Sequence, residues 1–394
     1  MRIQAAVRTD EVFATAPEEA MGSLNRPILY LVLAAVLSMP GISGAGPAFI
    51  QSGPSLPVQD SSIGRTDSSS ADSVTHVADT AKTACRLLSG SGLCLSGYTQ
   101  FRIQLFQPGE GKSGGADLRR IRFSLNGDPV DKWRYAFQAE FANTPKALDA
   151  SITYSPFTNL SLTAGQFKIP FSRENLESAS RLVFIDRPQA VEAFAARNAD
   201  VIGNQYGRDI GVQVSGSLTE RDGTLLLEYA AGVFNGAGIN TADNNNAKDF
   251  SGRAVIHPLG GLQLGGSYYN GFDKWGTPAV SRARQRAGLE FGYEYRSLNL
   301  SGEYIAGTDG SVSRAGWYAQ AGWFLVRRVL QVAARYDAFN SETASVGMTN
   351  INYVFGANYF FPPAIKVQAN YLVRREQKVQ VKNNLFEMQL QLAM

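Results

Sequence analysis

The sequence contains little histidine and little cysteine, two of each in 394 residues. His76 lies in a polar segment and His257 directly precedes Pro258, and neither has a cluster of other reactive side chains around it. A serine hydrolase needs a placed histidine as its base, so this chemistry has no convincing candidate. Two close cysteines without a nearby histidine make a poor metal site. The sequence therefore predicts no catalytic centre, no metal site and no cofactor.

Long apolar runs are also missing, with one exception at residues 28–39. This run is about half of the ~20 residues that a membrane helix needs. A basic residue precedes it and small residues follow it, the order of a secretory signal peptide, so we assign residues 1–48 to a signal. The acidic residues near the N-terminus are unusual for a signal, which makes Met21 an alternative start.

Charge of one sign is not in large excess, because the net charge is +3. This small value gives no reason to expect a nucleic-acid partner. Residues 49–92 are rich in Ser, Asp, Thr and Gly, which cannot bury enough apolar surface to offset chain entropy, so we expect a disordered linker. In an exported protein Cys85 and Cys94 can form a disulfide, and two unpaired thiols are the equal alternative.

Runs in which apolar and polar residues alternate are frequent in the chain, and residues 118–141 are the clearest example. Apolar residues at 121, 123 and 125 alternate with Arg120, Arg122 and Ser124, and a tight turn leads into a second alternating run. Side chains in a strand switch faces at every residue, so this is a β-hairpin with one apolar and one charged face. Similar runs recur sixteen times between residues 94 and 394. Each is close to the ~10 residues that a tilted membrane strand requires.

The lengths of the predicted connections depend on strand parity. Those after even-numbered strands are short, whereas most of those after odd-numbered strands are longer, among them residues 235–249, 271–284 and 306–314. Outer-membrane barrels combine short periplasmic turns with longer external loops. We therefore predict an all-β fold, a 16-stranded antiparallel transmembrane β-barrel over residues 93–394. Both termini, and with them the linker, would lie in the periplasm of a bacterium.

One predicted connection, residues 167–207, is about forty residues long, and connections of that length are usually functional. Residues 188–199 within it read as a short helix. A barrel of this size has a wide lumen, so we expect this third external loop to fold inward and narrow the channel.

Several segments together resemble the phosphate-selective porin O and P family. They are LRRIRFSLNG (118–127), GQFKIPFSRENLESAS (165–180), FIDRP (184–188), NQYGRDIGVQVSG (204–216) and YAAGVFNG (229–236). The resemblance covers residues 96–394. It implies a 16-stranded outer-membrane barrel, a homotrimer, a third loop that constricts each pore, and diffusion of anions, in some members phosphate or polyphosphate. The family tends to end in an aromatic residue, whereas this chain ends in Met394.

Selectivity in a pore comes from the charges that line it. The predicted registers place these basic residues inside: Arg102, Arg120, Arg122, Arg134, Arg253, Arg286, Arg335, Lys366 and Arg374. They also place these acidic residues inside: Glu140, Glu228, Glu290, Glu294, Glu303, Asp337 and Glu387. Arginines on neighbouring strands could bind oxyanions, because the guanidinium fork matches phosphate geometry. The equal alternative is a wall of arginines and carboxylates paired across strands.

The long loop carries its own basic residues, Lys168, Arg173, Arg181, Arg187 and Arg197, and a similar number of acidic ones. These basic side chains either line the constriction or attach the loop to wall carboxylates. The near balance of charge favours a weakly selective pore. The sequence thus predicts passive, weakly anion-favouring diffusion of small solutes through a barrel in outer-membrane lipid. The alternatives are a barrel with a structural or adhesion role and, less consistent with two histidines, a barrel enzyme.

Overall fold

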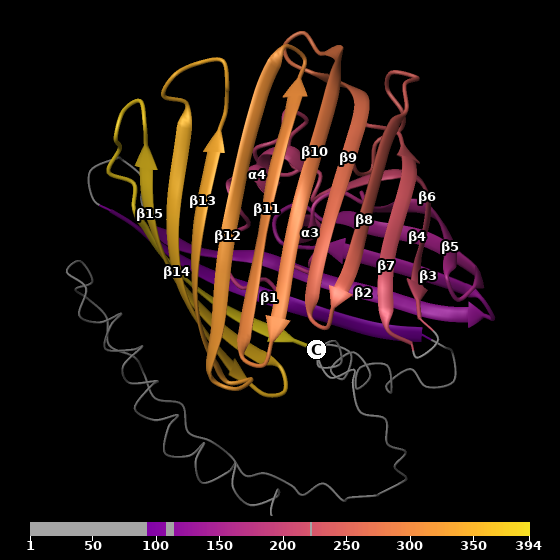
Figure 1. Ribbon diagram of the computed structural model, residues 1–394, viewed down its shortest axis with the longest axis horizontal. Coiled ribbons are helices and arrows are strands. Elements are labelled where there is room, and N and C mark those ends of the chain that lie inside the picture. Colours follow the sequence, from indigo (N-terminus) through magenta and orange to yellow (C-terminus); the bar gives the residue numbers. More distant parts are fainter. Residues whose placement is uncertain (1–92, 108–113, 221–222) are drawn as a thin grey trace, which may run out of the picture. The chain divides into compact units, whose positions relative to one another are not determined.

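A computed structural model describes residues 93–107, 114–220 and 223–394 (Figure 1). The predicted signal peptide, the linker, Met21 and Cys85 lie outside the described residues. Cys94, at the start of the first strand, is disulfide-bonded.

Sixteen antiparallel strands form one closed barrel in which every strand pairs with its neighbours in sequence and β1 pairs with β16. The strands are β1 Leu93–Phe106, β2 Gly115–Val130, β3 Trp133–Glu140, β4 Lys146–Phe157, β5 Leu160–Lys168, β6 Arg208–Thr219, β7 Leu225–Phe234, β8 Asp249–Leu259, β9 Leu262–Trp275, β10 Val280–Tyr295, β11 Leu298–Asp309, β12 Val312–Val326, β13 Leu330–Asn340, β14 Thr349–Phe361, β15 Ile365–Glu376 and β16 Leu385–Ala393. The predicted fold class is confirmed.

The last residue takes part in closing the barrel. Gly97 and Met394 exchange two backbone hydrogen bonds, each 2.9 Å long, and the pairing continues to Phe106 opposite Leu385. The terminal Met394 is therefore held in the ladder although it is not aromatic.

The distribution of polar and apolar side chains is the reverse of that in a soluble protein. Leu289 and Ile152 are 67% and 55% exposed on the outer face, whereas Asp337 and Glu387 are completely buried inside. A barrel in a membrane needs this arrangement, because lipid covers the outer face and polar groups line the interior.

Two predicted loops are wrong. Strand β9 continues to Trp275 and β10 begins at Val280. Residues 276–279 therefore connect them, whereas the sequence predicts a loop over 271–284. Likewise β11 and β12 are joined by residues 310–311 alone, in place of 306–314. Charged residues such as Asp273 and Arg284, which suggest loops in the sequence, are buried on the inner face of these strands and pair with each other.

Residues 169–207, here called the constriction loop, fold into the barrel. The loop contains α3 (Arg173–Leu176) and α4 (Gln189–Phe194), so the predicted helix at 188–199 exists but is shorter, and α3 is additional. Phe194 and its neighbours pack against inward-facing Ile305, Tyr318 and Phe339, and Figure 1 shows α4 behind β11 and β12. No helix in the described part of the chain is long and apolar enough to cross a membrane.

Candidate permeation pathway

A β-bulge in the first hairpin brings three arginines to the lumen. Gln100 of β1 is opposite Arg120 of β2, but the next residue, Phe101, is opposite Leu118. Arg119 is the extra residue, and a bulge of this kind re-aims the side chain that it contains. The Arg119 side chain is only 12% exposed and forms an ion pair with Asp186 of the constriction loop. It therefore points inward beside Arg120 and Arg122.

The partners of these three arginines differ. Arg122 donates to Glu140 at 2.7 Å and to the hydroxyl of Tyr98 at 3.1 Å. Arg120 donates to the side-chain oxygen of Gln100 at 2.7 Å, and within the described residues it forms no ion pair. Since Gln100 is neutral, this hydrogen bond leaves the positive charge of Arg120 without a paired carboxylate among the described residues.

Arg102 and Arg134 also lie on the inner face but are paired. Arg102 binds Asp117 through two hydrogen bonds, at 3.0 and 2.7 Å. Arg134 pairs with Asp128 at 2.9 Å, and its side chain is 68% exposed near the β2–β3 turn. Arg134 is thus at the end of the barrel, far along the strand from the bulge.

Other predicted wall residues hold the constriction loop. Lys366 donates to the carbonyls of Ser180 at 2.7 Å and Leu182 at 3.2 Å. Arg335 donates to the carbonyl of Asp186 at 2.9 Å. Arg286 donates to the carbonyl of Phe194, at the end of α4.

Two further basic residues of the predicted lining have nearby partners. Arg253 pairs with Glu290 across the wall, and Arg374 is 3.5 Å from the carbonyl of Asn383 in the loop after β15. The part of the wall that the structure describes thus contains both arrangements that the sequence leaves open, paired charges and an arginine without an ion pair.

Three basic residues of the loop region stabilise the loop itself. Lys168, the last residue of β5, donates to the carbonyls of Leu176 and Glu177, both at 2.9 Å. Arg187 donates to the carbonyls of Glu174 and Glu177, and Arg197 donates to the side chain and carbonyl of Asn175. These contacts gather at the C-terminal end of α3, where helix carbonyls lack intrahelical donors.

The remaining two loop residues behave differently. Arg181 pairs with Glu177 at 2.6 Å and is 47% exposed, so it is a cation on the open surface of the loop. The backbone N–H of Arg173 donates to the wall carboxylate Glu303 at 3.1 Å, while its side-chain Nε has no partner in the described structure. The expected attachment to wall carboxylates is thus made by the backbone of Arg173.

Two carboxylates of the loop are strongly held by wall arginines. Burial raises the pKa of Asp200, but the charges of Arg284 and Arg286 outweigh it and lower the pKa to about 2. Burial likewise opposes ionisation of Asp186, and Arg119 and Arg102 hold its pKa below the usual range. Both side chains therefore stay charged at neutral pH.

Sequence reasoning missed Arg119, Arg208 and Arg284. Arg208 binds Asp149 at 2.8 and 2.7 Å at the first residue of β6. The signal for Arg119 was the pair of consecutive arginines inside an otherwise alternating run, since two adjacent charges cannot both face inward without a bulge. The hydroxyl of Tyr98 accepts a hydrogen bond from Arg122 on the inner face.

Comparison with known proteins gives the family. Residues 95–394 match the family described as phosphate-selective porin O and P. The chain belongs to this family. Porin O of Pseudomonas aeruginosa is 26% identical over 212 residues, which are 51% of this chain and 44% of that protein. The chain thus matches less than half the length of this curated relative.

Solved structures share the fold at low identity. The anion-selective porin from Comamonas acidovorans is 13% identical with a TM-score of 0.57, covering 77% of this chain and 99% of that one. OmpF of Salmonella typhi is 11% identical with a TM-score of 0.59, over 77% and 97%. OmpT of Vibrio cholerae, in its trimer form, is 12% identical with a TM-score of 0.56, over 77% and 99%. The chain is an outer-membrane porin, and its family and fold are those of a channel rather than an enzyme.

Proposed function

We propose that small anions, inorganic phosphate among them, diffuse through this porin in moderate preference to cations. The observation that carries the proposal is the arginine triplet on the lumen side of β2, in which Arg120 faces the neutral Gln100. Fixed positive charge at a narrow point of a pore favours anions. The guanidinium group suits oxyanions in particular, because its N–H groups match their geometry.

The preference is expected to be moderate because most other basic residues are neutralised. Glu140 and Asp186 accompany Arg122 and Arg119, and Glu290 accompanies Arg253. Arg120 is then the cation that we assign to the permeation path, with Arg119 and Arg122 beside it.

The relatives support this proposal. The family is described as phosphate-selective, and one structural neighbour is described as anion-selective. Another neighbour was solved in a trimer form, and we propose a homotrimer here as well. We also propose that both termini lie in the periplasm, since the short turns are at the end of the barrel where β1 begins and longer connections such as residues 235–248 are at the other.

The decisive measurement is the reversal potential of the purified protein in a planar bilayer under a KCl gradient, repeated with phosphate added. We expect a value on the anion side and a reduced chloride current in phosphate. Arg120→Gln should move the reversal potential towards the cation side. Arg134→Gln, at the open end of the barrel, is the matched control and should leave it unchanged.

Cation selectivity of the wild-type protein would overturn the proposal. A correctly folded barrel without any conductance would instead favour a structural or adhesion role.

A further inference from the structure

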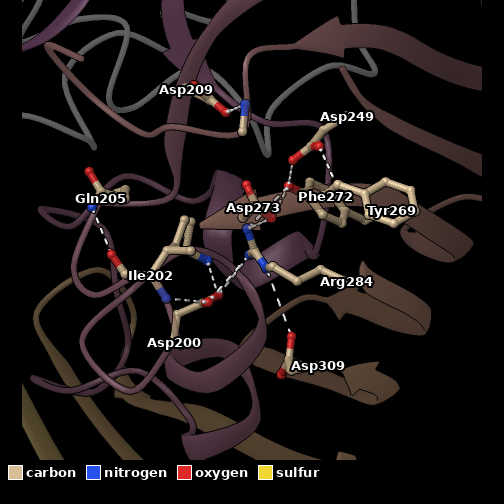
Figure 2. Close-up of polar contacts among 12 residues, drawn as sticks. Asp200, Ile202, Gln205, Asp209, Asp249, Tyr269, Phe272, Asp273, Arg284 and Asp309 are labelled. Carbon is tan, nitrogen blue, oxygen red and sulfur yellow. Dashed lines mark hydrogen bonds and ion pairs between the residues drawn. The ribbon is translucent and has the colours of Figure 1, made fainter. Parts of the chain in front are cut away.

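A second charged cluster lies where the constriction loop meets β6 and β8–β12. Its core is a network of three arginines and three carboxylates. Arg284 contacts Asp200, Asp273 and Asp309, as Figure 2 shows. Arg286 bridges Asp200 at 2.6 Å and Asp309 at 2.7 Å, and Arg314 also pairs with Asp309. The charges of these six side chains cancel.

Two more carboxylates adjoin this network without an arginine of their own. Asp209 and Asp249 are 5% and 0% exposed, and neither forms an ion pair with any described residue. The cluster therefore contains five carboxylates and three guanidinium groups. Buried charge that is not paired is costly, so the excess negative charge needs an explanation.

The geometry singles out Asp249 and Asp273. Oδ1 of Asp273 is completely buried and has no hydrogen-bond partner among the residues that the structure describes. A methyl group on Gly236 would lie 2.5 Å from this oxygen and 2.7 Å from Oδ2 of Asp249, so both oxygens face the same point. Tyr269 donates its hydroxyl to Asp249 and lies 3.5 Å from Asp273. Like charges this close cannot both persist in a buried site without a cation or a proton between them.

The available oxygens favour a proton over a metal ion. Asp209 accepts backbone N–H groups of Ile210 and Gly236, both at 2.7 Å, and Oδ1 of Asp249 accepts that of Phe272 at 2.9 Å. Calcium needs six to eight oxygens. Within the described ranges, no three acidic, histidine or cysteine side chains are arranged to hold a metal. A proton needs only the two facing oxygens.

We propose that Asp249 and Asp273 share one proton, and that this proton keeps the constriction loop anchored to the wall. It sits as O–H···O between the two carboxyl groups and comes from solvent. Asp209 is the remaining unpaired carboxyl group, and it accepts two backbone N–H groups. The charged and titratable groups facing the pair are Asp200 from the loop, Asp209 from β6, Tyr269 from β9, Arg284 and Arg286 from β10, Asp309 from β11 and Arg314 from β12.

The link to the loop runs through Arg284. This guanidinium donates to Asp273 with one nitrogen and to both oxygens of Asp200 with the other, at 3.3 Å. Asp200 in turn accepts the backbone N–H of Ala196 at 2.8 Å. When the pH rises and the proton leaves, Asp249 and Asp273 repel each other and Asp273 attracts Arg284 more strongly. Arg284 then holds Asp200 less well, so the loop becomes mobile at alkaline pH.

The test uses the purified full-length porin in planar bilayers across a pH series from mildly acidic to alkaline. Wild type should show steady open-channel current at neutral pH and increased noise at alkaline pH. Asp273→Asn and Asp249→Asn each replace the shared proton by an amide N–H, so either single variant should keep the steady current and lose the alkaline transition. In the double variant, two amides face each other and the pair no longer carries the one negative charge that both single variants keep, so its melting temperature should fall at every pH.

A spectroscopic readout is independent of the channel current. Infrared difference spectra should show the carbonyl stretch of a protonated carboxylic acid in wild type at neutral pH, absent from both single variants. Should one single variant fail to assemble, the other decides. An alkaline transition that persists in the single variants would overturn the proposal. A transition that appears only after chelation of divalent cations would do the same, because it would show that a metal ion occupies the site.

Discussion

The backbone N–H of Gln189 donates to both carboxylate oxygens of Asp337, at 3.0 and 3.2 Å. Gln189 is the first residue of α4, and Asp337 projects from β13. A carboxylate of the wall therefore accepts the hydrogen bonds of a backbone N–H at the N-terminal end of a helix in the constriction loop. A negative charge at this position satisfies a free N–H and interacts favourably with the helix dipole.

Asp337→Asn should therefore lower the free energy of unfolding by about 1 kcal/mol, since the amide keeps the shape and loses the charge. Thermal unfolding in detergent measures the change. Asp128→Asn is the control, because its pair with Arg134 is solvent-exposed and such pairs contribute roughly 0–1 kcal/mol. Equal melting temperatures for the two variants would contradict the role assigned to Asp337.

The sequence allowed the barrel to be predicted because strand alternation is a local property. The side chains of residues 121–125 switch faces with a period of two whatever lies across the sheet, so strand number and outward face could be derived without neighbours. The third loop was detectable by its length, and the family resemblance by its motifs.

The partners of the charged residues could not be predicted in the same way. Lys366 and Ser180 are 186 residues apart in the sequence, and no local pattern shows that this lysine holds the loop and does not line the pore. The bulge at Arg119 shifts the period by one residue, which reverses the face of every side chain beyond it. Asp273 and Arg284 resembled loop residues in the sequence because both are charged. They are buried in strands because they pair with each other, and the sequence does not show this pairing.

Lys366→Met should loosen the constriction loop. The variant removes the donor for the carbonyls of Ser180 and Leu182, and leaving buried acceptors unpaired costs about 1–3 kcal/mol. We expect a lower melting temperature and larger fluctuations of the open-channel current. Lys378→Met, at an exposed position in the loop between β15 and β16, serves as the control. If both variants behaved as wild type, Lys366 would not be an anchor.

Asp186→Asn should increase the preference for anions. The carboxylate of Asp186 pairs with Arg119 and lies 4.0 Å from Arg102, so its removal leaves more positive charge facing the lumen. The reversal potential under a KCl gradient should move further to the anion side than in wild type. Asp243→Asn, whose partner Lys248 is in the loop before β8, should not move it. An unchanged reversal potential in Asp186→Asn would exclude this part of the wall from the permeation path.

Acid should weaken the attachment of the loop through Asp200. The pKa of this carboxylate is lowered to about 2 in the folded barrel, against about 3.9 in an unfolded chain. A lowered pKa stabilises the fold above the unfolded value, and this stabilisation disappears as the pH falls through the folded value. The difference corresponds to about 2–3 kcal/mol at neutral pH, lost between about pH 4 and about pH 2. Asp200→Asn should lose the same stabilisation at every pH, so the melting temperatures of variant and wild type should converge in acid. Parallel curves that stay separated at the lowest pH would show that the ion pairs with Arg284 and Arg286 are not the source of the difference.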